Sequence, residues 1–206
     1  MRLNEKIIST SRRHFLTGVA STAVVAAVGG RASAFAADEA KGKRFPKNFR
    51  WGVATAGHQI EGNDTNSDLW LLENIKPTIY VERAGDACDS LHRYEEDIAL
   101  LAGFGFNTYR FSIEWSRIEP NQGFFSNAEL DYYKRLIEAC RRHGVAPAVT
   151  FLHGAAPRWF AQAGGWLNPE SLALFSRYCS TAAKALASDM GHLPLFPEQL
   201  ADPSRV

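Results

Sequence analysis

Polar and aromatic side chains that could bind a small molecule gather in three segments of the chain, residues 57–72, 114–125 and 153–166. Gln59 brings an amide, which donates and accepts hydrogen bonds at the same time, and His153 brings an imidazole. A single glutamine is most often a surface residue, and a single histidine is most often structural. These two become candidates for ligand binding because each lies just beyond an expected strand.

Strand patterns and helix patterns alternate along the chain from about residue 48. Alternating apolar residues predict strands at 48–56 and 107–113, and a mostly apolar run predicts a third strand at 145–152, buried on both faces. Residues 61–88 hold many Asn, Asp, Thr, Pro and Gly residues, and this composition predicts a long loop.

Three helices are expected between and after these strands. Asp89 is a candidate N-cap for the first, and Ser126 with Glu129 forms a capping box for the second. Asn168-Pro169 is expected to open the third, with proline at its first helical position. The apolar faces of the three helices consist of Leu91, Tyr94, Ile98 and Leu101; Leu130, Tyr133, Ile137 and Cys140; and Phe175, Tyr178, Ala182 and Leu186.

Successive strand–helix units favour an α/β fold with a parallel sheet and helices outside it. Two architectures fit this pattern, a (β/α) barrel and an open doubly wound sheet. No G-x-G-x-x-G or G-x-x-x-x-G-K-[ST] motif follows a strand, so the nucleotide-binding form of the open sheet lacks its phosphate loop. A complete barrel has eight units and about 250 residues, with its chemistry on the loops after the strands. We therefore expect an incomplete barrel with its first three units.

Composition excludes several other classes of protein. The 23 Lys and Arg residues nearly balance 22 Asp and Glu residues, so charge gives no reason to expect a nucleic-acid partner. A hydrophobic share of 46% and a charged share of 22% argue against a disordered chain. The 3 cysteines cannot form a disulfide framework, and no C-x-x-C or Cys/His cluster suggests a metal. No cofactor is expected.

The N-terminus has the layout of a secretory signal. Arg12-Arg13 precede a weakly apolar run that ends near Gly30, and Ala34 and Ala36 form an A-x-A cleavage site. The run has about 15 residues, short of the roughly 20 that a membrane-spanning helix needs. The arginine pair resembles the twin-arginine export signal.

We therefore predict a signal peptide at 1–36 and a solvated linker at 37–47. The resemblance implies passage through the twin-arginine export machinery to a periplasmic or extracellular location, with no membrane contact after cleavage. A retained membrane anchor stays open as the alternative. Because that route carries folded proteins with reduced thiols, Cys88, Cys140 and Cys179 are expected to be small buried residues.

Three blocks of sequence carry a further resemblance. They read FPKNFRWGVATAGHQIEG (45–62), GDACDSLHRYEEDIALLAGFGFNTYRFSIEWSRIEP (85–120) and LDYYKRLIEACRRHGVAPAVTFLHGAAPRWFAQAGGWLNPE (130–170). In this order they resemble the opening of glycoside hydrolase family one, the retaining β-glucosidases and their relatives. The resemblance implies a (β/α)8 TIM barrel, of which residues 48–189 supply the N-terminal portion, and hydrolysis of a β-glucoside or oligosaccharide.

The resemblance also implies roles for three residues. Gln59 matches a glutamine that binds hydroxyls of the sugar at the cleavage subsite, and His153 matches a histidine that binds the same sugar. Arg110, in Y-R-F-S-I, matches the arginine beneath the nucleophilic carboxylate, where a cation lowers the pKa of that carboxyl group. Gly154 stands where the family commonly has an aromatic residue, so the sugar preference stays open.

Retaining hydrolysis needs two carboxyl groups about 5–5.5 Å apart. The family takes them from an N-E-P motif and a [TI]-E-N-G motif, and neither occurs in these 206 residues. Glu61 and Glu114 lie on the expected barrel edge without matching a catalytic position. No catalytic residue and no metal ligand is therefore assigned. The resemblance fades over 190–206, which we expect to be an unrelated or frame-shifted tail of a truncated, inactive piece.

Two other functions stay open at this stage. The chain could be a non-catalytic sugar-binding remnant that uses Gln59, His153 and loop tryptophans. It could also be an exported redox protein, since many twin-arginine substrates carry cofactors, although no metal or nucleotide motif supports that function.

Overall fold

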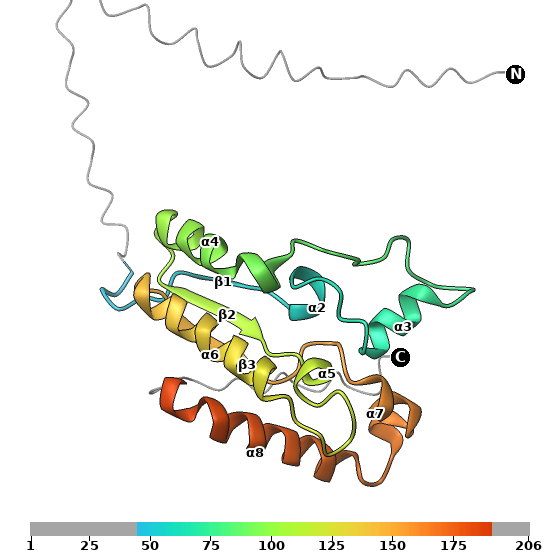
Figure 1. Ribbon diagram of the computed structural model, residues 1–206. Helices are drawn as coiled ribbons and strands as arrows, with labels where there is room; N and C mark the ends of the chain where they lie inside the picture. Colours follow the sequence, from blue (N-terminus) through green and yellow to red (C-terminus); the bar gives the residue numbers. More distant parts are fainter. Residues whose placement is uncertain (1–44, 191–206) are drawn as a thin grey trace, which may run out of the picture. The chain divides into compact units, whose positions relative to one another are not determined.

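The computed structural model of the chain describes residues 45–190 (Figure 1). The chain divides into two units, Met1–Pro46 and Lys47–Val206, and nearly all the described residues belong to the second. The expected signal peptide, most of the linker and nearly all of the tail lie outside the described residues.

A parallel sheet forms the centre of the second unit. Its strands are β1 (Gly52–Ala54), β2 (Thr108–Ser112) and β3 (Ala146–Thr150), paired in the order β1-β2-β3. Both pairings are parallel, with Arg110 of β2 opposite Ala148 of β3. The three predicted strands are confirmed, although each is shorter than its pattern. Their carboxyl ends meet at one edge of the sheet (Figure 1).

Three long helices form a layer against the sheet, α4 (Ser90–Gly103), α6 (Asn127–Arg142) and α8 (Ser171–Met190). Helix α6 contacts α4, α8 and β3, so it lies at the centre of this layer (Figure 1). Tyr109 and Phe111 of β2 belong to the hydrophobic core that the three helices share. Because side chains alternate along a strand, Arg110 lies on the opposite face of the sheet.

Short helical turns follow each strand at the carboxyl edge. They are α2 (Gly57–Ile60) and α3 (Asp68–Asn74) after β1, α5 (Trp115–Ile118) after β2, and α7 (Arg158–Gln162) with a 3-10 turn (Gly165–Leu167) after β3. This edge is therefore built from structured turns that can hold side chains in fixed positions.

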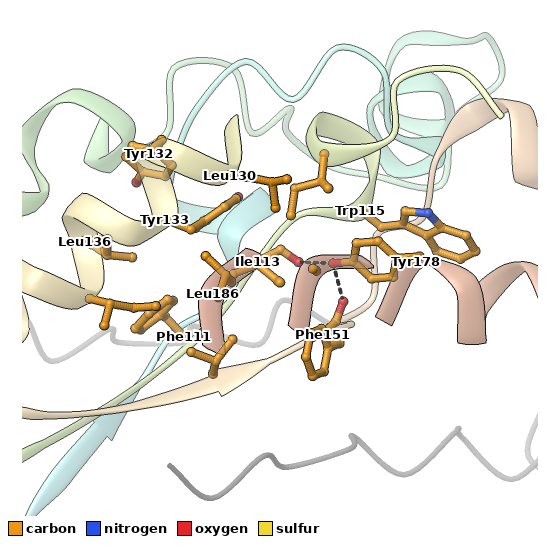
Figure 2. Close-up of a cluster of buried hydrophobic side chains, with 14 of the residues drawn as sticks. Phe111, Ile113, Trp115, Leu130, Tyr132, Tyr133, Leu136, Phe151, Tyr178 and Leu186 are labelled. Atoms are coloured by element: carbon orange, nitrogen blue, oxygen red, sulfur yellow. Dashed lines mark hydrogen bonds between the residues drawn. The ribbon is translucent and has the colours of Figure 1, made fainter. Parts of the chain in front are cut away.

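An aromatic cluster holds the C-terminal helix to the strand ends. Trp115 is fully buried and stacks on Tyr178, with ring centroids 5.0 Å apart. Trp159 packs edge-on against Trp115, with ring centroids 5.7 Å apart. The Tyr178 hydroxyl lies 3.0 Å from the carbonyl oxygen of Phe151 and 3.2 Å from that of Ile113, and donates to them (Figure 2). A single hydroxyl thus joins α8 to the ends of both β2 and β3.

The helix starts agree only in part with the sequence patterns. Ser126 caps α6 as predicted, because its hydroxyl accepts from the backbone N–H of Glu129. Asp89 precedes α4 as predicted, but its left-handed backbone (φ 55°) leaves its side chain without a capping hydrogen bond. Helix α8 begins at Ser171 and not at Pro169.

The long loop predicted at 61–88 is wrong in its first part, because α3 forms there. Ser67 provides the local cause, since its hydroxyl accepts from the N–H of Trp70 at 3.0 Å and so caps the helix. The many Asn, Asp and Thr residues around Ser67 are as common in loops as at helix starts. The composition of the segment therefore did not distinguish the capping residue of α3 from a loop residue.

The prediction that the cysteines are buried is confirmed at Cys140 and holds only in part at Cys179. Cys140 is buried and Cys179 is half-buried, and burial raises the pKa of their thiols to about 12 and about 11. Both therefore stay protonated and act as small apolar residues. Cys88 is exposed, so the prediction that it is buried is wrong.

The contacts of Tyr178 predict that Tyr178→Phe destabilises the full-length chain by about 1–3 kcal/mol, because buried carbonyl groups lose their partner. Urea unfolding followed by tryptophan fluorescence measures this loss. Tyr80→Phe, on the partly exposed loop after α3, is the control and should change stability by less than about 0.5 kcal/mol. Equal stability of Tyr178→Phe and the parent chain would contradict the role of the hydroxyl.

Candidate active site

The structure places Gln59 and His153 on the same edge of the sheet. Gln59 is an exposed residue of α2, the turn that directly follows β1, and half-buried His153 follows β3. Because the strands are parallel, the segments that follow their carboxyl ends emerge side by side, with the end of β2 between them. In α/β barrels this is the edge on which substrates bind.

Arg110 lies within β2, on the face of the sheet opposite the helices. Its Nε donates to Oγ1 of Thr150 on β3 at 2.9 Å, so the guanidinium lies across two neighbouring strands. In a closed barrel this face lines the interior. Arg110 is therefore positioned below the edge that carries Gln59 and His153.

Glycine at the start of α2 brings that turn close to the end of β2. The N–H of Gly57 donates to Oγ of Ser112 at 2.8 Å, and the Ser112 hydroxyl donates to Oε1 of Glu114 at the same distance. Gly57, Ser112 and Glu114 are all buried. The turn that carries Gln59 is thus hydrogen-bonded to β2 through a serine and a glutamate.

Glu61 fixes the other end of α2. Its carboxylate accepts from Nε of Arg117 at 2.9 Å and from the Tyr133 hydroxyl at 3.1 Å. The Tyr133 hydroxyl in turn accepts from the backbone N–H of Glu114 at 2.9 Å. This single tyrosine of α6 therefore joins the segment after β1 to the segment after β2.

Burial dominates the electrostatics of these carboxyl groups. It raises the pKa of Glu61 to about 7, although the Arg117 charge and the Tyr133 hydroxyl act in the opposite direction. Burial, with the charges of Glu61 and Asp64, raises the pKa of Glu114 well above its ordinary value. The Asp64 carboxylate itself accepts from the Ser116 hydroxyl. Glu61 and Glu114 face partners within the protein, so we assign them structural roles.

His58, next to Gln59, anchors α2 to the following helix. Its Nε2 lies 2.9 Å from Oε1 of Glu73 on α3, and Oε2 of Glu73 accepts from the N–H of Ala84 at 3.0 Å. His58 and Glu73 are both buried. Residues on either side of Gln59 are therefore held in place, while the Gln59 side chain is exposed. Within residues 45–190, no cluster of His, Cys, Asp or Glu side chains is arranged to hold a metal ion.

Sequence reasoning missed the residues that support this edge. The helical pattern assigned Tyr133 to the core, and the structure confirms its burial, but the partners of its hydroxyl lie far away in the sequence. The glycine before His58 was the one available signal, because an isolated glycine often marks a close approach of backbone to another group.

Comparison with known proteins identifies the family. Residues 41–200 match the model described as glycosyl hydrolase family 1. Among curated relatives, beta-glucosidase A of Acetivibrio thermocellus is 40% identical over 149 residues, which are 69% of this chain and 33% of that protein.

Solved structures agree with this match. The beta-glycosidase BGL167 superposes with a TM-score of 0.71 at 55% identity, covering 73% of this chain and 36% of the other. The beta-glucosidase of Thermotoga maritima in complex with cyclophellitol gives 0.70 at 32% identity, covering 76% and 37%. This chain thus spans about a third of the length of these relatives. The expected fold class, three units of a (β/α)8 barrel, is confirmed. The chain belongs to glycosyl hydrolase family 1.

Proposed function

We propose that the protein hydrolyses β-glycosidic bonds with retention of configuration, as a β-glucosidase-like enzyme. The observation that supports the proposal is the parallel order β1-β2-β3 in a family 1 chain, in which Gln59 and His153 follow the carboxyl ends of β1 and β3 and Arg110 lies within β2 between them. Relatives named as beta-glucosidases support the substrate class. Because this chain spans about a third of their length, the activity is proposed for the protein as a whole.

Each of the three residues has a role that its position allows. Gln59 and His153 hold sugar hydroxyls at the carboxyl edge, where an amide and an imidazole each exchange hydrogen bonds with neighbouring hydroxyls. Arg110 lies below them and keeps the nucleophilic carboxylate ionised, since a nearby cation lowers the pKa of a carboxyl group.

The chemistry of bond cleavage needs two further carboxyl groups. One attacks the anomeric carbon while the other protonates the departing oxygen, and water then releases the sugar from the first group. The 206 residues contain neither an N-E-P nor a [TI]-E-N-G motif. We therefore assign to this part of the protein the binding and positioning of the sugar, and not the cleavage of the bond.

Gly154, the residue after His153, stands where the family commonly has an aromatic residue, so the sugar subsite beside His153 is either open or lined by another part of the protein. Gly154 has a positive φ of 84°, and a Cβ at this position would lie 3.8 Å from the Leu69 side chain. Space therefore exists for a side chain, but this backbone conformation disfavours any residue other than glycine. We propose that the subsite is wider here than in relatives with an aromatic residue at this position.

We also propose that the protein is exported by the twin-arginine route to the periplasm or cell exterior. The order of Arg12-Arg13, an apolar run and the A-x-A site at 34–36 supports this. Within residues 45–190, no helix has the length and apolar character to cross a membrane. On this proposal residues 1–36 are removed, and 37–47 link the signal to the barrel.

The export proposal predicts that replacing both Arg12 and Arg13 with Lys stops export, because the pair is the feature that the route reads. Cell fractionation and immunoblotting measure the exported share. Arg2→Lys, outside the pair, is the matched control and should leave export unchanged. Export of the double variant at the parental level would remove the assignment.

The lack of both carboxylate motifs predicts that the purified 206-residue chain has no turnover on aryl β-glucosides. Release of the aryl group measures activity. A rate that survives rigorous purification and falls in Glu61→Gln or Glu114→Gln would show that these carboxyl groups act in catalysis. It would then overturn their structural assignment.

Completing the barrel is predicted to give retaining hydrolysis. The downstream part of beta-glucosidase A would be fused after Met190, and NMR of the first product would report its configuration. Gln59→Ala and His153→Ala should lower kcat/KM about tenfold or more, because each removes a hydrogen bond to the sugar. Exposed Gln122→Ala and His92→Ala are matched controls.

Arg110→Met in the same fused enzyme tests a different role. Loss of the cation should raise the pKa of the nucleophile, which must be ionised to react, so the acidic limb of the pH–rate profile should move to higher pH. Indifference of a working enzyme to the Gln59, Arg110 and His153 substitutions would refute the site assignments and leave the family assignment intact. Sugar binding without hydrolysis would favour the non-catalytic alternative.

A further inference from the structure

The hydrogen bonds between α2 and β2 have a fixed direction. A serine hydroxyl carries one proton, and Ser112 gives it to Oε1 of Glu114 at 2.8 Å. The oxygen of Ser112 therefore presents its lone pairs to the N–H of Gly57, which donates to it at 2.8 Å. The acceptor oxygen on Glu114 thus determines the orientation of the Ser112 hydroxyl. In that orientation the Ser112 oxygen accepts from the N–H of Gly57, the first residue of α2.

Glu114 also occupies the space that a side chain at position 57 would need. A Cβ on Gly57 would lie 2.6 Å from Cγ and 2.7 Å from Cδ of Glu114, well inside van der Waals contact. Gly57 is not among the residues with positive φ, so its backbone conformation is open to any amino acid. Glycine is required here for space, and Glu114 is the group that fills the space.

Glu114 is also held through its backbone, and charged groups from several elements surround its carboxyl group. Its backbone N–H donates to the Tyr133 hydroxyl of α6. The titratable and charged groups that act on its carboxyl are Glu61 and Asp64 from the segment after β1, Arg117 from α5, Tyr133 from α6 and Tyr178 from α8. Burial and the two neighbouring carboxyl groups raise the pKa of Glu114. A glutamine keeps the shape of this side chain and an oxygen that can accept from the Ser112 hydroxyl.

The position of Gln59 follows from that of Gly57. The turn is closed by hydrogen bonds from the Gln59 N–H to the Ala56 carbonyl at 3.0 Å and from the Glu61 N–H to the Gly57 carbonyl at 2.8 Å. A shift of Gly57 would move the whole turn, and with it the exposed amide of Gln59.

We propose that Glu114 is a positioning residue for Gln59, acting through the orientation of the Ser112 hydroxyl and through the space it shares with Gly57. The proposal rests on the sugar-binding role proposed for Gln59. It extends the site to a carboxyl group that touches neither the sugar nor the reacting atoms.

Hydrogen–deuterium exchange of the full 206-residue chain tests this directly, with Glu114→Gln, Glu114→Ala, Gly57→Ala and the double variant Gly57→Ala/Glu114→Ala. The readout is the exchange rate of the amides of residues 57–61, compared with those of 175–186 in α8. Glu114→Ala should speed exchange in the turn about tenfold and leave α8 unchanged, because one oriented hydrogen bond is lost. Glu114→Gln should restore the parental rate, since its amide oxygen still accepts from Ser112.

The two alanine substitutions should also depend on each other. Gly57→Ala alone should speed exchange of the turn, and adding Glu114→Ala should slow it again, because the small residue makes room for the new methyl group. Equal rates for Glu114→Gln and Glu114→Ala would overturn the hydrogen-bond argument, and additive effects would overturn the steric one. An equal increase in the exchange rate of α8 would show that Glu114 stabilises the whole fold, and it would overturn the specific positioning role.

This experiment separates the inference from the proposed function because it uses no sugar and no hydrolysis. An inactive completed barrel would leave the exchange result standing. An unprotected turn in the parental chain would overturn the positioning role whatever the enzyme does.

Discussion

Polar groups buried between the segment after β1 and the end of β2 impose the constraint on which the candidate site depends. A buried polar group that loses its partner costs about 1–3 kcal/mol, so every such group here needs a donor or acceptor. Ser112, Tyr133 and Arg117 supply them from β2, α6 and α5. Because these partners come from three elements, the turn that carries Gln59 has its place only when sheet and helices are assembled together.

The two faces of the sheet differ in character, since one is apolar and packs against the helices and the other carries polar side chains. On the helix side, Tyr109 and Phe111 join an apolar core, and Tyr178 ties α8 to the ends of β2 and β3. On the other side, Arg110 reaches across to Thr150. Packing on one face thus supports a polar arrangement on the other, which is the face that lines the interior of a closed barrel.

Patterns within single segments predicted most of this fold. Alternation in β2 and the capping box of α6 depend on neighbouring residues, and the structure confirms both. The expected strand ends predicted where Gln59 and His153 lie, and the resemblance supplied the roles expected of them. Their position on a common edge of the sheet follows from the order of the parallel strands. The contacts of Gly57 with Ser112 and Glu114 were missed, because they join residues more than fifty positions apart and leave no periodic trace. The same holds for the exposure of Cys88, which the tertiary packing of its loop decides.

On the proposed function, the segments at the three strand ends of this chain position a sugar. The most direct test is a crystal structure of the completed barrel with cyclophellitol, the ligand in the Thermotoga maritima structure. The account predicts that the side chains of Gln59 and His153 lie within hydrogen-bond distance, about 2.7–3.2 Å, of hydroxyls of the bound molecule. A structure in which cyclophellitol occupies the barrel and contacts neither residue would contradict it.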